Sequence, residues 1–228
     1  MADHVRDLAS VREATERLLT AAAKWNNDSV AEPSRLPGWT RGHVLAHLAR
    51  NADALVNVFE GRVMYVSQEA RDADIERDAA RPLDVHLADI GRTAARLQEA
   101  GAVPADWSRT VELRNGVTDS VSRVPFRRWI EVELHHVDLG IGYELEDLPA
   151  EFAEREIDFL VERFTGHPEV PPTVITDGTR AWSTGSGAAG PEVTVTGPAP
   201  ELLGWLAGRR EGSALHVEGG ALPSLPPL

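Results

Sequence analysis

The sequence predicts an α+β protein in which a helical bundle, residues 1–165, precedes a small α+β domain, residues 166–228. Apolar residues recur at helical spacing through most of the first part. At Gly166 this pattern stops, and prolines and short β-rich runs follow. A length of 228 residues is enough for one large domain or two small ones, with a core that needs no disulfide or metal.

Six helices are expected before Gly166, and residues at their ends support four of them. Asp3 can cap the first helix and Thr40 the second, while Pro82 and Pro125 suit the first turns of the fourth and the fifth. The expected helices cover residues 5–25, 41–60, 67–79, 82–99, 125–140 and 151–165. Helices of this length with apolar stripes are typical of a bundle.

Short β-rich runs predict the remaining elements. A strand at residues 111–113 precedes a turn at Asn115 and Gly116. The C-terminal domain is expected to contain strands at residues 173–176, 181–183, 193–196 and 214–218 and a helix at residues 201–207.

The composition excludes several kinds of chemistry. The chain has no cysteine, which rules out disulfides, thiolate zinc sites, iron–sulfur clusters and a cysteine nucleophile. Any metal must therefore be held by His, Asp and Glu, and any thiol chemistry must bring its sulfur from outside the chain.

The charge pattern argues against two classes of partner. The net charge is −13, which makes nucleic acid and anionic membranes poor candidates. No apolar run reaches the roughly 18 residues of a membrane span. The first residues also lack the basic start and the apolar run of a signal peptide, so a cytoplasmic location is expected.

The predicted fifth helix carries residues that could bind a metal. Glu131 and His135 are four residues apart and share one helical face, with Asp138 close enough to orient the imidazole. On this spacing alone, a solvated acidic face with chance histidines is the better interpretation. The second helix adds His43 and His47, and one of these two with Glu131 and His135 would give three ligands and an open position, as in catalytic zinc sites.

The chain resembles the mycothiol-dependent maleylpyruvate isomerase family of DinB-like four-helix metalloproteins. The similarity covers nearly the whole chain in the same order. It rests on residues 36–48 (LPGWTRGHVLAHL), 64–67 (MYVS), 69–76 (EARDADIE), 131–139 (EVELHHVDL), 204–209 (GWLAGR) and 215–219 (LHVEG). Glu133 and His136 depart from the family's helix motif, but neither lies on the face of Glu131.

The resemblance implies a DinB-like four-helix bundle and a zinc site. It implies that zinc, or another divalent metal, is bound by His47, Glu131 and His135, which leaves His43 without a ligand role. Asp138 would orient His135 or pack the helix. Arg209 would bind the substrate and act in catalysis, reaching the zinc face of the bundle from the second domain, and Arg71 is a second candidate for substrate binding.

The implied reaction is the cis–trans isomerisation of maleylpyruvate to fumarylpyruvate in gentisate-type aromatic degradation. Mycothiol would add to the double bond, the new single bond would rotate, and the thiol would be eliminated. The partners are then a small dicarboxylate substrate and a low-molecular-weight thiol, and one chain can complete the site as a monomer. Two alternatives remain: a mycothiol S-transferase on the same scaffold, and a non-catalytic metal-binding module.

Overall fold

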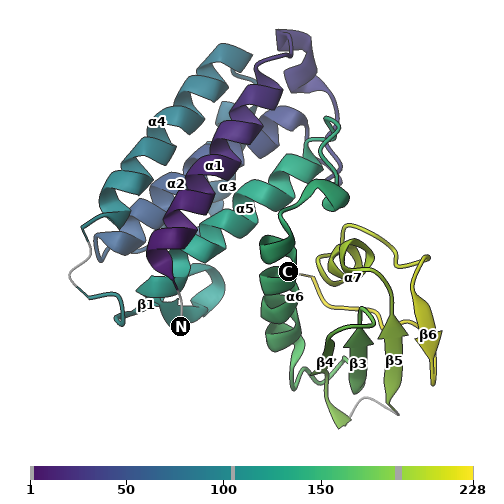
Figure 1. Ribbon diagram of the computed structural model, residues 1–228. Helices are drawn as coiled ribbons and strands as arrows, with labels where there is room; N and C mark the ends of the chain where they lie inside the picture. Colours follow the sequence, from purple (N-terminus) through teal and green to yellow (C-terminus); the bar gives the residue numbers. More distant parts are fainter. Residues whose placement is uncertain (1–2, 104–105, 188–191, 228) are drawn as a thin grey trace. The chain divides into compact units, whose positions relative to one another are not determined.

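The computed structural model describes residues 3–103, 106–187 and 192–227 (Figure 1). The chain divides into two compact units, residues 1–143 and 144–228, and each is described by itself. The division falls earlier than the boundary predicted at residue 165. Helix α6, Ala150–Phe164, was expected to complete the bundle but packs on α7, Ala199–Leu206, and on β4, Ala181–Thr184, within the second unit. An apolar stripe shows that a helix is half-buried but not which partner covers it, so the spacing of its apolar residues could not assign α6 to a unit.

The first unit is a four-helix bundle. It consists of α1, His4–Ala22; α2, Arg41–Phe59; α4, Leu83–Gly101; and α5, Val124–Asp138. Both α1 and α2 pack against α4 and against α5, which closes the four helices around one core, and α3, Gln68–Ala79, packs on the side of α2 (Figure 1).

The predicted apolar stripes form the core of this bundle. Its largest fully buried apolar side chains come from three helices: Leu18, Leu45, Leu48, Leu55, Ile90 and Leu97. Burying a leucine side chain stabilises a fold by about 1.5–3 kcal/mol, and all six residues belong to the apolar stripes that the sequence predicts. The helix ends fall within three residues of their predicted positions.

A short hairpin connects α4 to α5. Strand β1, Thr110–Glu112, pairs antiparallel with β2, Thr118–Ser120. The connection turns at Asn115 and Gly116, whose φ angles are 59° and 72°. Glycine and asparagine tolerate this left-handed backbone, which is why the pair predicted a turn, whereas β2 was not predicted.

The second unit contains a four-stranded sheet with the order β4-β3-β5-β6. Strands β3, Thr173–Thr176, and β5, Val193–Thr196, run parallel, while β4 and β6, His216–Glu218, lie antiparallel at the two edges. The helices α6 and α7 pack against each other, and α6 contacts β4. Among the described residues, no helix is long and apolar enough to cross a membrane.

Candidate metal centre

Three side chains from two helices of the bundle meet at one point. His47 lies on α2, and Glu131 and His135 lie one turn apart on α5. Glu131 Oε2 is 2.9 Å from His47 Nε2 and 3.2 Å from His135 Nε2. One ligand atom from each of the three residues lies within 4.8 Å of the others. The structure therefore brings together the three residues that the sequence proposes as ligands.

His135 is held in the orientation that a metal ligand needs. Its Nδ1 lies 2.8 Å from Asp138 Oδ2, and the Asp138 carboxylate is buried. Burial by itself lowers the pKa of His135, but the hydrogen bonds to Asp138 and Glu131 outweigh it and raise the pKa above its usual value. A carboxylate that receives the second N–H of a ligating histidine is the usual partner in zinc sites.

His47 makes a different contact with its second nitrogen. The Arg71 guanidinium on α3 lies 3.2 Å from His47 Nδ1 through its Nη2. Arginine can only donate hydrogen bonds, so Nδ1 accepts, and the imidazole proton sits on Nε2 and is donated to Glu131. Burial lowers the pKa of His47 to about 4, although the nearby Glu131 carboxylate acts to raise it. The ring is therefore neutral at neutral pH.

Glu131 is the negative charge of the group. Its side chain is 32% exposed, whereas that of His47 is 6% exposed. Removal from water tends to raise the pKa of Glu131, but the charges of the two histidines and their hydrogen bonds hold it well below the ordinary value. An ionised carboxylate between two imidazoles, one of them backed by Asp138, is a donor set that suits zinc and several other divalent ions. The residues therefore fit a divalent metal.

Helical spacing alone did not decide whether His43 or His47 is the ligand on α2, and the two residues have different contacts in the structure. His43 belongs to a capping box at the start of α2: its backbone N–H donates to the Thr40 side chain, and its own Nδ1 accepts from the Thr40 backbone. Its Nε2 lies 3.1 Å from Glu76. His43 thus caps the N-terminus of α2, and of these two histidines only His47 contacts Glu131.

Two further residues near the triad were not assigned a role from the sequence. Tyr65 lies beneath Arg71, with the guanidinium carbon 5.9 Å from its ring centre. Burial and the Glu131 carboxylate raise the pKa of its phenol. The MYVS motif drew attention to this segment, but a loop has no periodicity that would place its side chains.

Arg128 is the second residue, and it is notable because its charged side chain is buried. The side chain is 1% exposed, and its Nη1 donates to Leu48 O at 2.9 Å and to Asn51 Oδ1 at 2.7 Å. Its Nε and Nη2 have no hydrogen-bond partner among the described residues. Burial lowers its pKa to about 10, which still leaves it charged at neutral pH. Arg128 therefore provides a positive charge one turn before Glu131 on α5.

Arg209 lies in the other compact unit, just after α7. Its Nη1 donates to Ala207 O at 2.7 Å, and it lines a cavity of about 750 Å³ within that unit. The neighbouring Arg210 forms ion pairs with Glu146 and Glu201. Of the two predicted arginines, the structure thus brings Arg71 into contact with the triad, and the role of Arg209 stays a prediction.

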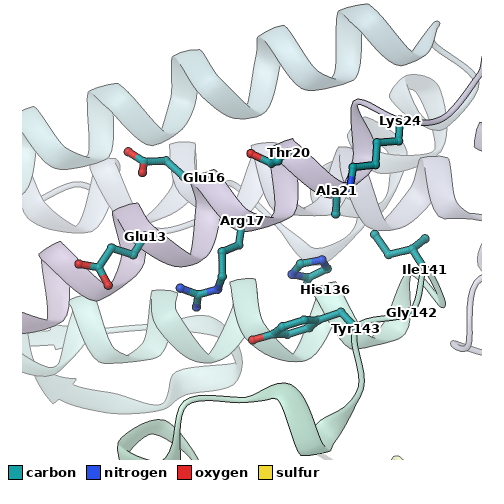
Figure 2. A pocket seen from close by; sticks show the side chains of 10 residues that line it. All are labelled: Glu13, Glu16, Arg17, Thr20, Ala21, Lys24, His136, Ile141, Gly142 and Tyr143. Carbon is teal, nitrogen blue, oxygen red and sulfur yellow. The ribbon is translucent and has the colours of Figure 1, made fainter.

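The opposite side of α5 carries a second polar cluster. The fully buried Glu133 accepts hydrogen bonds from Arg17, from Trp129 Nε1 at 2.9 Å and from the Tyr143 hydroxyl at 2.8 Å. His136 stacks on Tyr143 with ring centres 4.0 Å apart; the two rings face each other near Arg17 in a pocket of about 650 Å³ (Figure 2). Glu133 and His136 lie away from the triad, as the helical spacing predicts.

Comparisons with known proteins agree along the whole chain. Residues 11–140 match the family model described as the mycothiol maleylpyruvate isomerase N-terminal domain, and residues 147–227 match the model for the C-terminal domain of the same family. A crystal structure of the mycothiol-dependent maleylpyruvate isomerase is similar with a TM-score of 0.89 and 27% sequence identity, over 99% of this chain and 97% of that one. A histidine-to-alanine variant of that enzyme matches over the same shares of the two chains, with a TM-score of 0.88 and 26% identity. A comparison with curated proteins found no similar sequence.

Proposed function

Because the chain belongs to the mycothiol maleylpyruvate isomerase family, we propose that it isomerises maleylpyruvate to fumarylpyruvate with mycothiol at a zinc site. The observation that carries this proposal is the convergence of His47, Glu131 and His135 in the family's own domain. The similarity to solved structures of the mycothiol-dependent maleylpyruvate isomerase, over nearly the full length of both chains, supports the same reaction.

His47, Glu131 and His135 would hold the metal and leave a coordination position open. A divalent ion there supplies Lewis acidity, which lowers the pKa of a thiol or polarises a substrate oxygen. His135 must first give up the proton on Nε2, while Asp138 keeps the proton on Nδ1 and fixes the ring. Asp138 thus orients His135 for metal binding, and burial keeps His47 neutral, the form that can bind a metal.

Arg71 is assigned to a substrate carboxylate. His47 can act as a ligand through Nε2 only when its proton moves from that nitrogen to Nδ1. The Nδ1 proton then faces Arg71 Nη2, which is itself a donor and loses this acceptor, while Nη1 still donates to Asp72 Oδ1 at 2.7 Å. The buried Nε of Arg71 has no partner among the described residues, so two of the guanidinium nitrogens would favour an anionic group, and the substrate is a dicarboxylate.

A thiol nucleophile has to come from a small molecule, because the chain has no cysteine. Mycothiol would supply the sulfur that adds to the double bond and leaves after rotation. For the second carboxylate we assign Arg209. In the Arg209→Ala variant, zinc binding is expected to be intact and isomerisation badly impaired; turnover near the wild-type rate would defeat this assignment.

An absorbance assay on maleylpyruvate, with and without mycothiol and zinc, tests the proposal. Isomerisation should require both additions, and the concentration of free thiol should be unchanged at the end. Consumption of the thiol would indicate an S-transferase instead.

The His47→Ala variant should lose zinc and activity together, and a variant that retains a full equivalent of zinc would show that the ligand assignment is wrong. A wild-type protein that binds zinc and does not turn over maleylpyruvate would favour a non-catalytic metal-binding role.

A further inference from the structure

We propose that Tyr65 is a catalytic residue of this site, whose hydroxyl donates a hydrogen bond to the substrate oxygen that becomes negative during the reaction. This inference rests on the proposed function and adds a residue to it. Three features of Tyr65 support it: its contact with Arg71, the absence of an acceptor for its hydroxyl proton, and the free space beside its ring.

Arg71 connects Tyr65 to the metal centre. One guanidinium nitrogen contacts His47 Nδ1 at 3.2 Å, and the guanidinium carbon lies 5.9 Å from the ring centre of Tyr65. The same planar group therefore touches a proposed metal ligand and the phenol. A substrate carboxylate bound by Arg71 would lie within reach of both.

The hydroxyl proton of Tyr65 is available for a ligand. Within residues 3–103, 106–187 and 192–227, it is donated to no acceptor, and Arg71 cannot accept one. The other tyrosine of the chain, Tyr143, donates to Glu133 at 2.8 Å. Burial and the Glu131 carboxylate raise the pKa of Tyr65, so the phenol stays protonated and keeps its donor.

There is also room beside the ring. Tyr65 lines a cavity of about 250 Å³ between the loop before α3 and the β1–β2 hairpin, together with Met64, Gln68 and Arg114. The side chain is half-buried rather than sealed in the core. A small ligand can therefore reach the Tyr65 side chain from this cavity, whose lining does not include Arg71 or the three proposed ligands.

The reaction gives this donor a defined task. When the thiolate sulfur forms a bond to one alkene carbon, the π electrons of the alkene move through the conjugated system to a carbonyl oxygen. When that electron pair returns, the sulfur–carbon bond breaks and the thiolate leaves, so the thiol is regenerated. Tyr65 keeps its proton throughout and stabilises the charged oxygen by a hydrogen bond that is stronger in the transition state than in the ground state.

The Tyr65→Phe variant removes the donor and keeps the ring. The turnover number is expected to fall by about 10²–10³-fold, as for loss of one oxyanion donor, with KM within a few-fold of wild type and zinc content unchanged. Tyr143→Phe is the matched control: it removes a hydroxyl from the opposite side of α5 and should leave turnover unchanged. A Tyr65→Phe enzyme that folds, binds zinc and turns over like wild type would overturn the proposal.

A second measurement tests Tyr65 as a hydrogen-bond donor without an assay of turnover. Oxalate is a small planar dianion whose oxygens can accept from both Arg71 and Tyr65. Its affinity for the zinc-loaded protein, measured by calorimetry, should fall about tenfold in Tyr65→Phe and stay at the wild-type value in Tyr143→Phe. If the wild type fails to isomerise maleylpyruvate, the proposed function is wrong, but the oxalate comparison still tests Tyr65. Equal oxalate affinity in the wild type and Tyr65→Phe would overturn its assignment as a donor.

Discussion

Helix α5 presents two glutamates on opposite sides, one partly exposed and one fully buried, and their surroundings differ. Glu133 is fully buried and accepts from Arg17, Trp129 and Tyr143, all groups that donate at neutral pH. Glu131 is partly exposed, and its Oε2 faces two imidazoles, groups that can lose a proton and bind a metal. A carboxylate whose hydrogen-bond donors keep their protons at neutral pH stabilises the fold. A carboxylate whose donors are imidazoles can exchange their protons for a metal ion, so it is suited to a metal site.

The most severe effect is expected from Glu131→Gln. The amide keeps the shape of the side chain but removes the negative charge from the three-ligand set, so zinc affinity should fall by at least about 100-fold. Metal titration monitored by calorimetry checks this. If Glu131→Gln binds zinc like the wild type, the distinction between the two sides of α5 fails.

Asp138→Asn should weaken the metal site without removing a ligand. Loss of a carboxylate behind a ligating histidine lowers metal affinity by about 10–100-fold. The variant should also change the pH dependence. The pKa of His135 is raised mainly by Asp138 and Glu131 acting against burial, and the metal must displace that proton, so zinc affinity falls as the pH drops through this raised pKa. Without the Asp138 charge the pKa of His135 is lower, and the fall should move to lower pH; an unchanged profile would contradict the role of Asp138.

Glu133→Gln should affect stability and leave the metal site intact. The amide can accept only through one oxygen, so a buried donor loses its partner and the Arg17 charge loses its counter-ion. Arg17 is partly exposed, so the expected cost is about 2 kcal/mol, or about 4–8 °C in Tm for a chain of this size. Thermal denaturation and zinc titration are the two measurements. A loss of zinc affinity in this variant would show that the two clusters are coupled.

The smallest change in stability is expected from Arg128→Met, on the metal side of α5. Arg128 is buried with two of its three nitrogens unpaired, so its desolvation cost offsets much of what its two hydrogen bonds contribute. Replacement by an apolar side chain of similar length should leave the free energy of unfolding within about 1 kcal/mol of wild type. Destabilisation as large as that of Glu133→Gln would mean that Arg128 is a structural residue.

Helical spacing predicts the bundle and the shared face of Glu131 and His135, but their role as ligands comes from the resemblance to the family. Glu131 and His135 share a face at a separation of four residues, whatever surrounds them. The choice between His43 and His47 depends on which turn of α2 faces α5, and the resemblance to the family, not the spacing, selected His47. The partner of α6, the conformation of the loop that carries Tyr65 and the burial of Arg128 all arise from tertiary packing, which one sequence does not reveal.

X-ray absorption at the zinc edge of the loaded wild-type protein tests the ligand set most directly. We expect two imidazole nitrogens at about 2.0–2.1 Å, one carboxylate oxygen and one exchangeable light atom, with the spectrum unchanged in Glu133→Gln. Three imidazoles, or a spectrum that changes in Glu133→Gln and not in Glu131→Gln, would contradict it.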